Sequence, residues 1–204
     1  MTTRLSITTL FCATVFGLLA IFPIPAVAQN APLSLASAKV SIAGTSNIHE
    51  WTASTSDVAV TKLTLAGSGG VLATALNPGA VTTFEIAVRA KTLTSPKEGL
   101  DKNMHKALKA DEFADITFRL SRFEAKAAGV TRAVGMLKIA GVEREVAFDL
   151  KTAAAPTSLT VSGEVPLLMT DFGITPPKAL MGMLKTDPKV VVKFETVFAM
   201  PATY

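Results

Sequence analysis

The chain has 204 residues, with 20 lysines and arginines against 16 aspartates and glutamates, which gives a formal net charge of +4. The basic residues are spread along the chain and are not interleaved with aromatic residues, which argues against a nucleic-acid-binding stripe. The single cysteine, Cys12, lies in an N-terminal apolar segment, so disulfides and thiol chemistry are not expected in the rest of the chain.

Residues 1–28 have the pattern of an export signal. Arg4 supplies a positive region, residues 5–22 are almost entirely apolar, and Ala26-Val27-Ala28 is a small-residue cleavage motif. The apolar run is short for a retained membrane anchor. We therefore expect export of the protein, cleavage after residue 28, and a single mature domain over residues 29–204 without stable membrane insertion.

The first half of the mature chain alternates with the period of β-strands. Val40 and Ile42 mark the first strand, and a turn-rich run follows. Further along, the apolar phase slips between residues 60 and 63, which predicts a β-bulge or a break in the strand near Lys62. The motif at residues 77–79, Asn-Pro-Gly, predicts a turn. The next strand has its apolar residues at Phe84, Ile86 and Val88.

The stretch from residue 92 to residue 120 contains the one clear helix of the sequence. Ser95 is predicted to be its N-cap, with Pro96 at the first helical position and Glu98 completing a capping box. The helix is expected to be an amphipathic lid or plug on a curved sheet, because its apolar residues share one face. These residues are Leu100, Met104, Ala107 and Leu108.

The second half returns to a period of two. Residues 128–129 and Ala140-Gly141 predict turns, the latter a tight hairpin. A methionine-rich segment at residues 180–184 precedes the last strand. The alternating segments lie at residues 116–120, 137–139, 142–150, 159–165 and 190–198.

About eight period-two segments predict an all-β domain with one helix, folded as an antiparallel barrel or a sandwich. Alternation alone is equally compatible with both. The phenylalanine-rich inward phase, with the helix and residues 180–184 as movable cover, favours a barrel with an apolar lumen. One tryptophan and one tyrosine do not supply the aromatic girdles of an outer-membrane barrel, which disfavours that class.

Several sequence blocks occur in the same order as in the YceI-like family and resemble it over essentially the whole mature chain. The resemblance implies a lipocalin-like antiparallel β-barrel that holds a polyisoprenoid or a similar long-chain lipid, such as a quinone-like molecule, in the periplasm. The chain departs from the family pattern at two places. Ala114 stands where many members have proline, and residues 96–99 are a variant of the segment that leads into the helix. The blocks are residues 44–53, 95–104, 107–111, 116–118, 135–142, 169–174 and 176–177.

The resemblance implies that apolar residues of the lumen and its mouth bind the ligand, although periodicity does not separate a ligand tunnel from ordinary packing. Methionines suit such a site because thioethers adapt to a flexible chain. Head-group contacts are expected from His49, Asp101 and Arg144. The expected lumen and mouth residues are Ile42, Trp51, Phe84, Ile86, Val88, Met104, Leu108, Phe113, Phe118, Leu137, Phe148, Phe172, Ile174, Met181, Met183 and Phe194.

The predicted function is an exported lipid carrier or store rather than an enzyme. No nucleophile elbow is present, and Ser46 with His49 supports a lipid hydrolase only as a minor alternative. His49 and His105 lack zinc-site spacing and are interpreted as a polar turn residue and a solvated helix residue, so no metal or cofactor is expected. A binding module that acts on a protein partner in a stress response is the competing class, and homodimer formation stays open.

A second interpretation of His49 concerns Trp51. The two side chains would fix the entry to the second strand through a hydrogen bond and packing.

Overall fold

The computed structural model describes residues 33–66, 77–126, 130–179 and 183–199. The predicted signal segment, residue 181 and the turn predicted at residues 128–129 lie outside these ranges. Within these ranges lie the 3-10 helices η2 (Ala90–Thr92) and η4 (Met169–Phe172) and the α-helix α1 (Glu98–Ala107). The strands are β1 (Ser34–Ser46), β2 (Glu50–Thr55), β3 (Val58–Leu65), β4 (Val81–Arg89), β5 (Asp115–Ala125), β6 (Thr131–Ile139), β7 (Val142–Ala155), β8 (Ser158–Leu168), β9 (Lys178–Ala179) and β10 (Leu184–Ala199).

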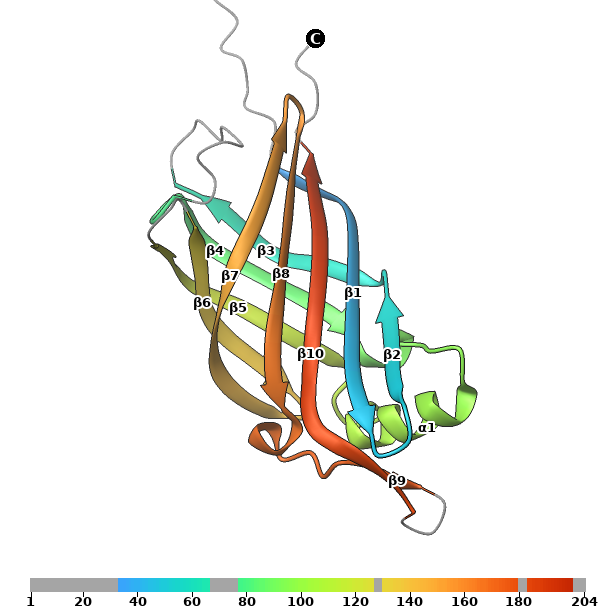
Figure 1. Cartoon of the computed structure of the whole chain (residues 1–204). Helices are drawn as coiled ribbons and strands as arrows, with labels where there is room; N and C mark the ends of the chain where they lie inside the picture. Colours follow the sequence, from blue (N-terminus) through green and yellow to red (C-terminus); the bar gives the residue numbers. More distant parts are fainter. Residues whose placement is uncertain (1–32, 67–76, 127–129, 180–182, 200–204) are drawn as a thin grey trace, which may run out of the picture.

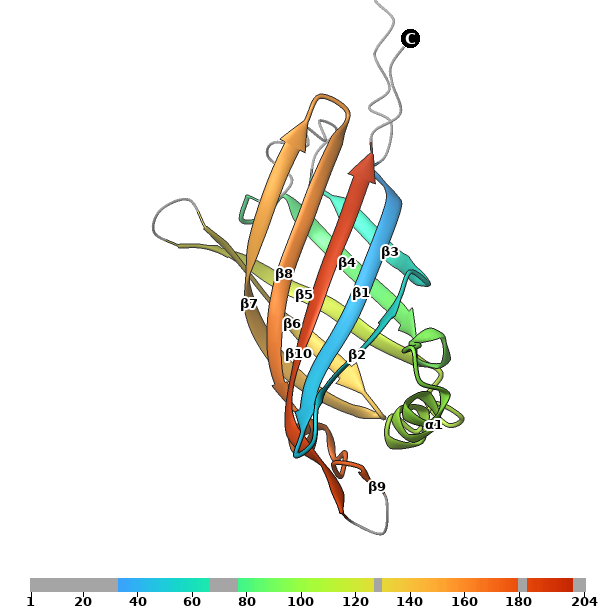
Figure 2. The same ribbon diagram turned by 45° about the vertical axis from the view of Figure 1, so that its right-hand side comes forward.

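The strands form one antiparallel sheet in the order β2-β1-β10-β8-β7-β6-β5-β4-β3, and β9 pairs with β10 (Figure 1). The two ends of this order, β2 and β3, follow one another in the chain, so the sheet curls back on itself (Figure 2). Among the described strands no ladder joins β2 to β3. The fold is therefore a strongly curled, lipocalin-like half-barrel, which confirms the predicted barrel and excludes the sandwich.

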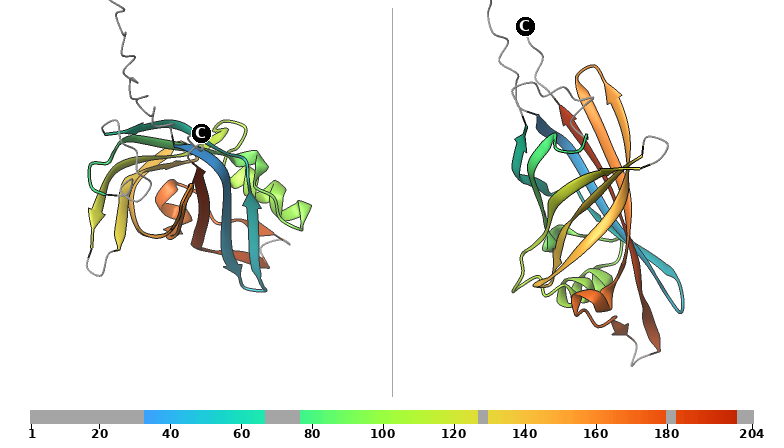
Figure 3. Two further views of the ribbon diagram at one scale, coloured as in Figure 1. Left: turned by 90° about the horizontal axis from the view of Figure 1, so that it is seen from above. Right: turned by 90° about the vertical axis from the view of Figure 1, so that its left-hand side faces the viewer.

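The strands are long and carry their apolar residues on the concave face. Ile86, Phe118 and Leu137 lie opposite one another in the ladders of β4, β5 and β6, so the apolar residues of these strands point to the same side of the sheet. Strand β10 alone has 16 residues, which corresponds to roughly 50 Å of extended chain. The half-barrel is therefore elongated, and α1 lies across one of its ends (Figure 3).

Local irregularities fall where the sequence predicts them. The register of β3 against β4 shifts between Val60 and Lys62, which confirms the bulge. Ala140 and Gly141 have φ values of 48° and 82° and join β6 to β7 directly, as a two-residue hairpin requires. The amide of Ala80 donates to the carbonyl of Asn77 at 3.0 Å and closes the predicted turn.

The predicted start of the helix is wrong. Helix α1 begins at Glu98, and its N-cap, Lys97, has an extended backbone and no side-chain cap. Ser95 lies outside the helix because Thr94 is held in a β-bridge with Ser54, so the chain is still extended there. The hydroxyl of Ser95 instead accepts from the amide of Lys97 at 3.1 Å and stabilises the turn into the helix.

Inward-facing glycines allow three aromatic rings to lie against the sheet. A Cβ at Gly163 would come within 2.7 Å of the Phe194 ring, and one at Gly135 within 2.6 Å of the Phe118 ring. A Cβ at Gly44 would come within 2.5 Å of the Trp51 ring, on the strand paired with it. These rings consequently cover the strands as part of the wall instead of projecting into the interior.

We expect the substitution Gly163→Val to destabilise the fold by about 1–3 kcal/mol, because the new side chain displaces the Phe194 ring. Equilibrium urea unfolding measures this change. The matched control is Ala153→Val, which adds the same kind of side chain at an exposed position of β7 and should change the unfolding free energy little. Equal stability of the two variants would contradict this account of the ring packing.

Candidate functional site

The half-barrel encloses a cavity of about 780 Å³. It extends from α1 and η4 at one end to residues such as Leu33, Val81 and Phe123 at the other. Its volume lies in the range of small-molecule sites. No large side chain among the described residues is completely buried, because the strands surround this space and do not pack on a solid core.

A belt of phenylalanines crosses the wall of the cavity. The ring centroids of Phe118 and Phe148 are 5.4 Å apart, and those of Phe148 and Phe194 are 5.5 Å apart. These rings come from β5, β7 and β10, and the intervening strands β6 and β8 contribute Gly135 and Gly163. Large and minimal side chains thus alternate around the wall, which keeps the middle of the cavity open.

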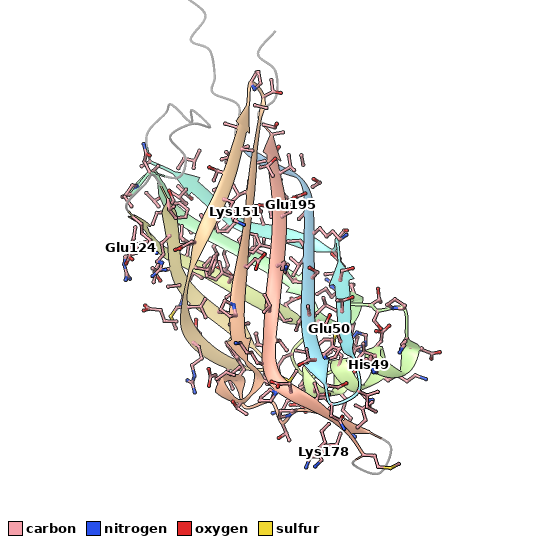
Figure 4. All side chains as sticks on the ribbon, viewed as in Figure 1. His49, Glu50, Glu124, Lys151, Lys178 and Glu195 are labelled. Atoms are coloured by element: carbon pink, nitrogen blue, oxygen red, sulfur yellow. The ribbon has the colours of Figure 1, made fainter. Side chains whose placement is uncertain are left out.

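Polar and exposed side chains gather at the end of the cavity next to α1, which we call the mouth. Figure 4 shows His49 and Glu50 at this end, beside the helix. Thr196, whose hydroxyl donates to the carbonyl of Val161 at 3.1 Å, is the other polar lining residue and lies away from the mouth. The polar mouth residues are Ser46, His49, Glu50, Thr52, Ser95, Lys97, Asn103 and Thr186.

Helix α1 covers the mouth with its apolar stripe. Met104 and Leu108 are buried, and Leu100 and Ala107 also line the cavity. The imidazole of His105 is half-buried, with Nε2 2.8 Å from the carbonyl oxygen of Leu93. The prediction of a solvated histidine at this position is therefore wrong. The stripe of the predicted lid is confirmed, and His105 helps to hold it in place.

Most of the predicted ligand-binding residues lie on the cavity wall, and their role in binding stays a prediction. His49 lines the mouth as an exposed turn residue, in agreement with its interpretation from the sequence. The other predicted residues on the wall are Ile42, Trp51, Phe84, Ile86, Val88, Met104, Leu108, Phe118, Leu137, Phe148, Phe172, Ile174 and Phe194.

Four predicted site residues are absent from the described cavity lining, and each has another environment. The Phe113 ring lies against Gly141, and Met183 is 69% exposed. The carboxylate of Asp101 accepts from the amide of Ser95 at 2.8 Å. The guanidinium Nε of Arg144 donates to the carbonyl of Asp171 at 3.0 Å, which joins β7 to η4.

The sequence analysis missed two groups of lining residues. The first group consists of strand residues. They could have been predicted, because they continue the alternation of inward-facing apolar residues in strands that the sequence already indicated. The mouth residues Ser46, Lys97 and Asn103 carried no such signal, since only the folded chain brings β1 and α1 together. The missed strand residues include Leu120, Leu150, Leu159, Val161, Val165, Val190, Val192 and Phe198.

Polar groups at the mouth make local contacts of the backbone and show no catalytic arrangement of Ser46 with His49. The Ser46 hydroxyl donates to the backbone carbonyl of His49 at 2.8 Å, so it closes a turn and is not bonded to the imidazole. The indole Nε1 of Trp51 is buried without a hydrogen-bond partner, so the predicted hydrogen bond at this position is wrong. Among the described residues, no group of three or more metal-ligating side chains comes together.

The perturbed carboxylates lie away from the cavity. The ammonium of Lys91 lowers the pKa of Asp111 by a hydrogen bond and by its charge. Arg132, at 2.7 Å, and then Lys126 lower the pKa of Asp149 on the outer face.

Within the described part of the chain, no helix has the length and apolar character needed to cross a membrane.

Comparison with known proteins places this architecture in a family. The sequence pattern of the YceI-like domain matches residues 34–198, which is most of the chain. No curated protein matches the sequence.

Solved structures share the fold at low sequence identity. The chain is similar to Burkholderia cenocepacia BcnA, with a TM-score of 0.62 and 15% identity over 78% of this chain and 95% of that one. It is also similar to a Saccharophagus degradans polyisoprenoid binding domain, with a TM-score of 0.58 and 12% identity over 84% of this chain and 99% of that one. For a Campylobacter jejuni YceI protein the TM-score is 0.54, with 14% identity over 72% of this chain and 82% of that one. At these identities the likeness concerns the fold alone.

We expect Leu108→Ala to loosen α1 over the mouth, because this buried side chain anchors the helix to the cavity wall. The loss should be about 2–5 kcal/mol of unfolding free energy, with faster amide exchange in α1 than in the strands. Hydrogen exchange followed by mass spectrometry measures both effects. Lys106→Ala, at an exposed position of the same helix, is the control and should leave exchange in α1 nearly unchanged.

Proposed function

This chain belongs to the family of YceI-like domains, and from that premise we propose that its lumen holds a polyisoprenoid or another long-chain lipid. The protein would act as a periplasmic carrier or store, exported through its N-terminal segment, and not as an enzyme. The observation that carries the proposal is the cavity of about 780 Å³. Away from the mouth its described wall is apolar except for Thr196, whose hydroxyl donates to the backbone carbonyl of Val161.

The size of the cavity supports a chain-like ligand. At about 30 Å³ for each water-sized group, the space accommodates roughly two dozen non-hydrogen atoms. The cavity runs along the length of the strands, so an extended hydrocarbon fits it better than a compact polycyclic molecule. A small polar substrate would leave most of the apolar wall without contacts.

The chemistry of the wall favours hydrocarbon over polar ligands. Each methylene group that leaves water for this wall contributes about 0.8 kcal/mol, which has to exceed the entropic costs of ordering the chain and of association. A long chain meets that condition without polar contacts. The wall therefore supplies affinity but little discrimination between one hydrocarbon chain and another.

The head group of the ligand would lie at the mouth. Of the residues expected to contact it, His49 lines the mouth. Asp101 and Arg144 are not part of the described lining, and they form hydrogen bonds with the backbone of Ser95 and Asp171 respectively. Ser46, Lys97 and Asn103 are further lining residues with polar side chains at the same end. We infer that these mouth residues, and not the wall, distinguish a phosphate from a quinone or an alcohol.

The direct test is to extract the protein with organic solvent after purification from its native host and to analyse the extract by mass spectrometry. We expect one dominant class of long-chain lipid, in an amount close to that of the protein. Denatured protein from the same preparation serves as the control for lipid that adheres unspecifically. An extract without long-chain lipid would contradict the proposal.

A lumen-filling variant tests the site itself. Ile86→Trp enlarges a half-buried side chain on the cavity wall and should reduce bound lipid by roughly tenfold, because it removes several methylene contacts. Ala59→Trp, at an exposed position on the neighbouring strand β3, is the matched control. If the protein's effect in the cell survives Ile86→Trp while lipid binding is lost, it acts through a protein partner instead.

A further inference from the structure

Large exposed apolar side chains are gathered at one end of the molecule. Among the described residues they are Ile48 in the β1–β2 turn, 61% exposed, Met183 just before β10, 69% exposed, and Leu168 at the end of β8. Figure 1 shows these segments together at the lower end of the half-barrel, near α1. Grouped exposed apolar residues indicate an interaction surface, whereas scattered ones do not.

Two of these segments are joined by the side chain of Asn47. Its Nδ2 donates to the carbonyl of Met183, and its Oδ1 accepts from the amide of Lys185, both at 2.8 Å. The backbone amide of Asn47 also donates to the carbonyl of Lys185 at 3.1 Å. The β1–β2 turn and the start of β10 are thus one fixed edge. We call Ile48, Met183, Lys178 and Lys185 the tip surface.

The charges of the tip surface indicate an anionic partner. Lys178 and Lys185 are directly opposite one another in the β9–β10 ladder, and both are exposed. Like charges in this position repel. Neither lysine forms an ion pair with another described residue. Anionic groups placed against the edge would relieve the repulsion.

Nearby acids form no ion pair with these two lysines among the described residues. Glu50 lies higher, beside α1, whereas Lys178 is at the lower extremity (Figure 4). The carboxylate of Asp187 accepts from the backbone amide of Lys189 at 2.8 Å, where the register of β10 against β1 shifts.

We propose that the tip surface docks on an anionic lipid bilayer. Ile48 and Met183 would enter the headgroup region, and Lys178 with Lys185 would contact lipid phosphates. A bilayer offers both features that this edge requires, negative charge at its surface and apolar material directly beneath. The mouth of the cavity lies at the same end, so docking turns it towards the membrane. This surface contact does not depend on which ligand the lumen holds.

Vesicle flotation of the purified chain tests the proposal. We expect binding to vesicles rich in phosphatidylglycerol, little binding to pure phosphatidylcholine vesicles, and a decrease with added salt. The double substitution Lys178→Glu with Lys185→Glu should lower the partition coefficient roughly tenfold or more. Ile48→Ser with Met183→Ser should lower it as well, at unchanged net charge.

Two controls separate docking from net charge and from lipid carriage. Lys39→Glu with Lys151→Glu makes the same charge change at exposed positions on the strand walls and should retain most of the binding. Ile86→Trp should still float with the vesicles even where lumen loading fails. Absence of wild-type binding at low salt, or equal losses from the tip and wall double variants, would overturn the proposal.

Discussion

The structure depends on one constraint: a long sheet with one apolar face has to hide that face from water, and among the described elements no second layer covers it. Curling the sheet onto itself achieves this, because the inward residues of β4, β5 and β7 then face those of β8 and β10. Burial of apolar surface stabilises the curl at about 25 cal/mol per Å². The sheet is too wide for its own side chains to fill the interior, and a cavity is the consequence.

The cover of the mouth depends on the same apolar surface. A helix of ten residues such as α1 is marginal in water by itself, so packing must hold it. Met104 and Leu108 provide that packing against the cavity wall, and His105 adds a contact to the carbonyl of Leu93. The element that covers the mouth is thus held by side-chain packing and the His105 contact, whereas the strands are joined by continuous ladders of backbone hydrogen bonds.

Sequence reasoning recovered what depends on neighbouring residues in the chain. The inward phases, the bulge at Lys62 and the hairpin at Ala140 follow from local patterns. The start of α1 did not, because the bridge between Thr94 and Ser54 overrides the capping signal at Ser95. The hydrogen bonds of Asp101 and Arg144 were not predictable for a similar reason, since their partners are backbone groups that only the folded chain brings close. A curled sheet and a sandwich have the same alternation of apolar and polar residues along their strands. The pairing of strands that are distant in the chain therefore decides between the two folds.

The asymmetry of the cavity has a consequence for how an amphiphile would occupy it. Away from the mouth the described wall is apolar apart from Thr196, whose hydroxyl is bonded to a backbone carbonyl. Such a wall gives a hydrocarbon chain no preferred register, so the polar end has to fix the depth of the ligand. On the proposed function, that end stays among the mouth residues while the chain slides along the phenylalanine belt. If the tip surface contacts a bilayer, the head group remains near the water–lipid boundary throughout transfer. The chain then passes between two apolar environments, which lowers the cost of exposing it to water.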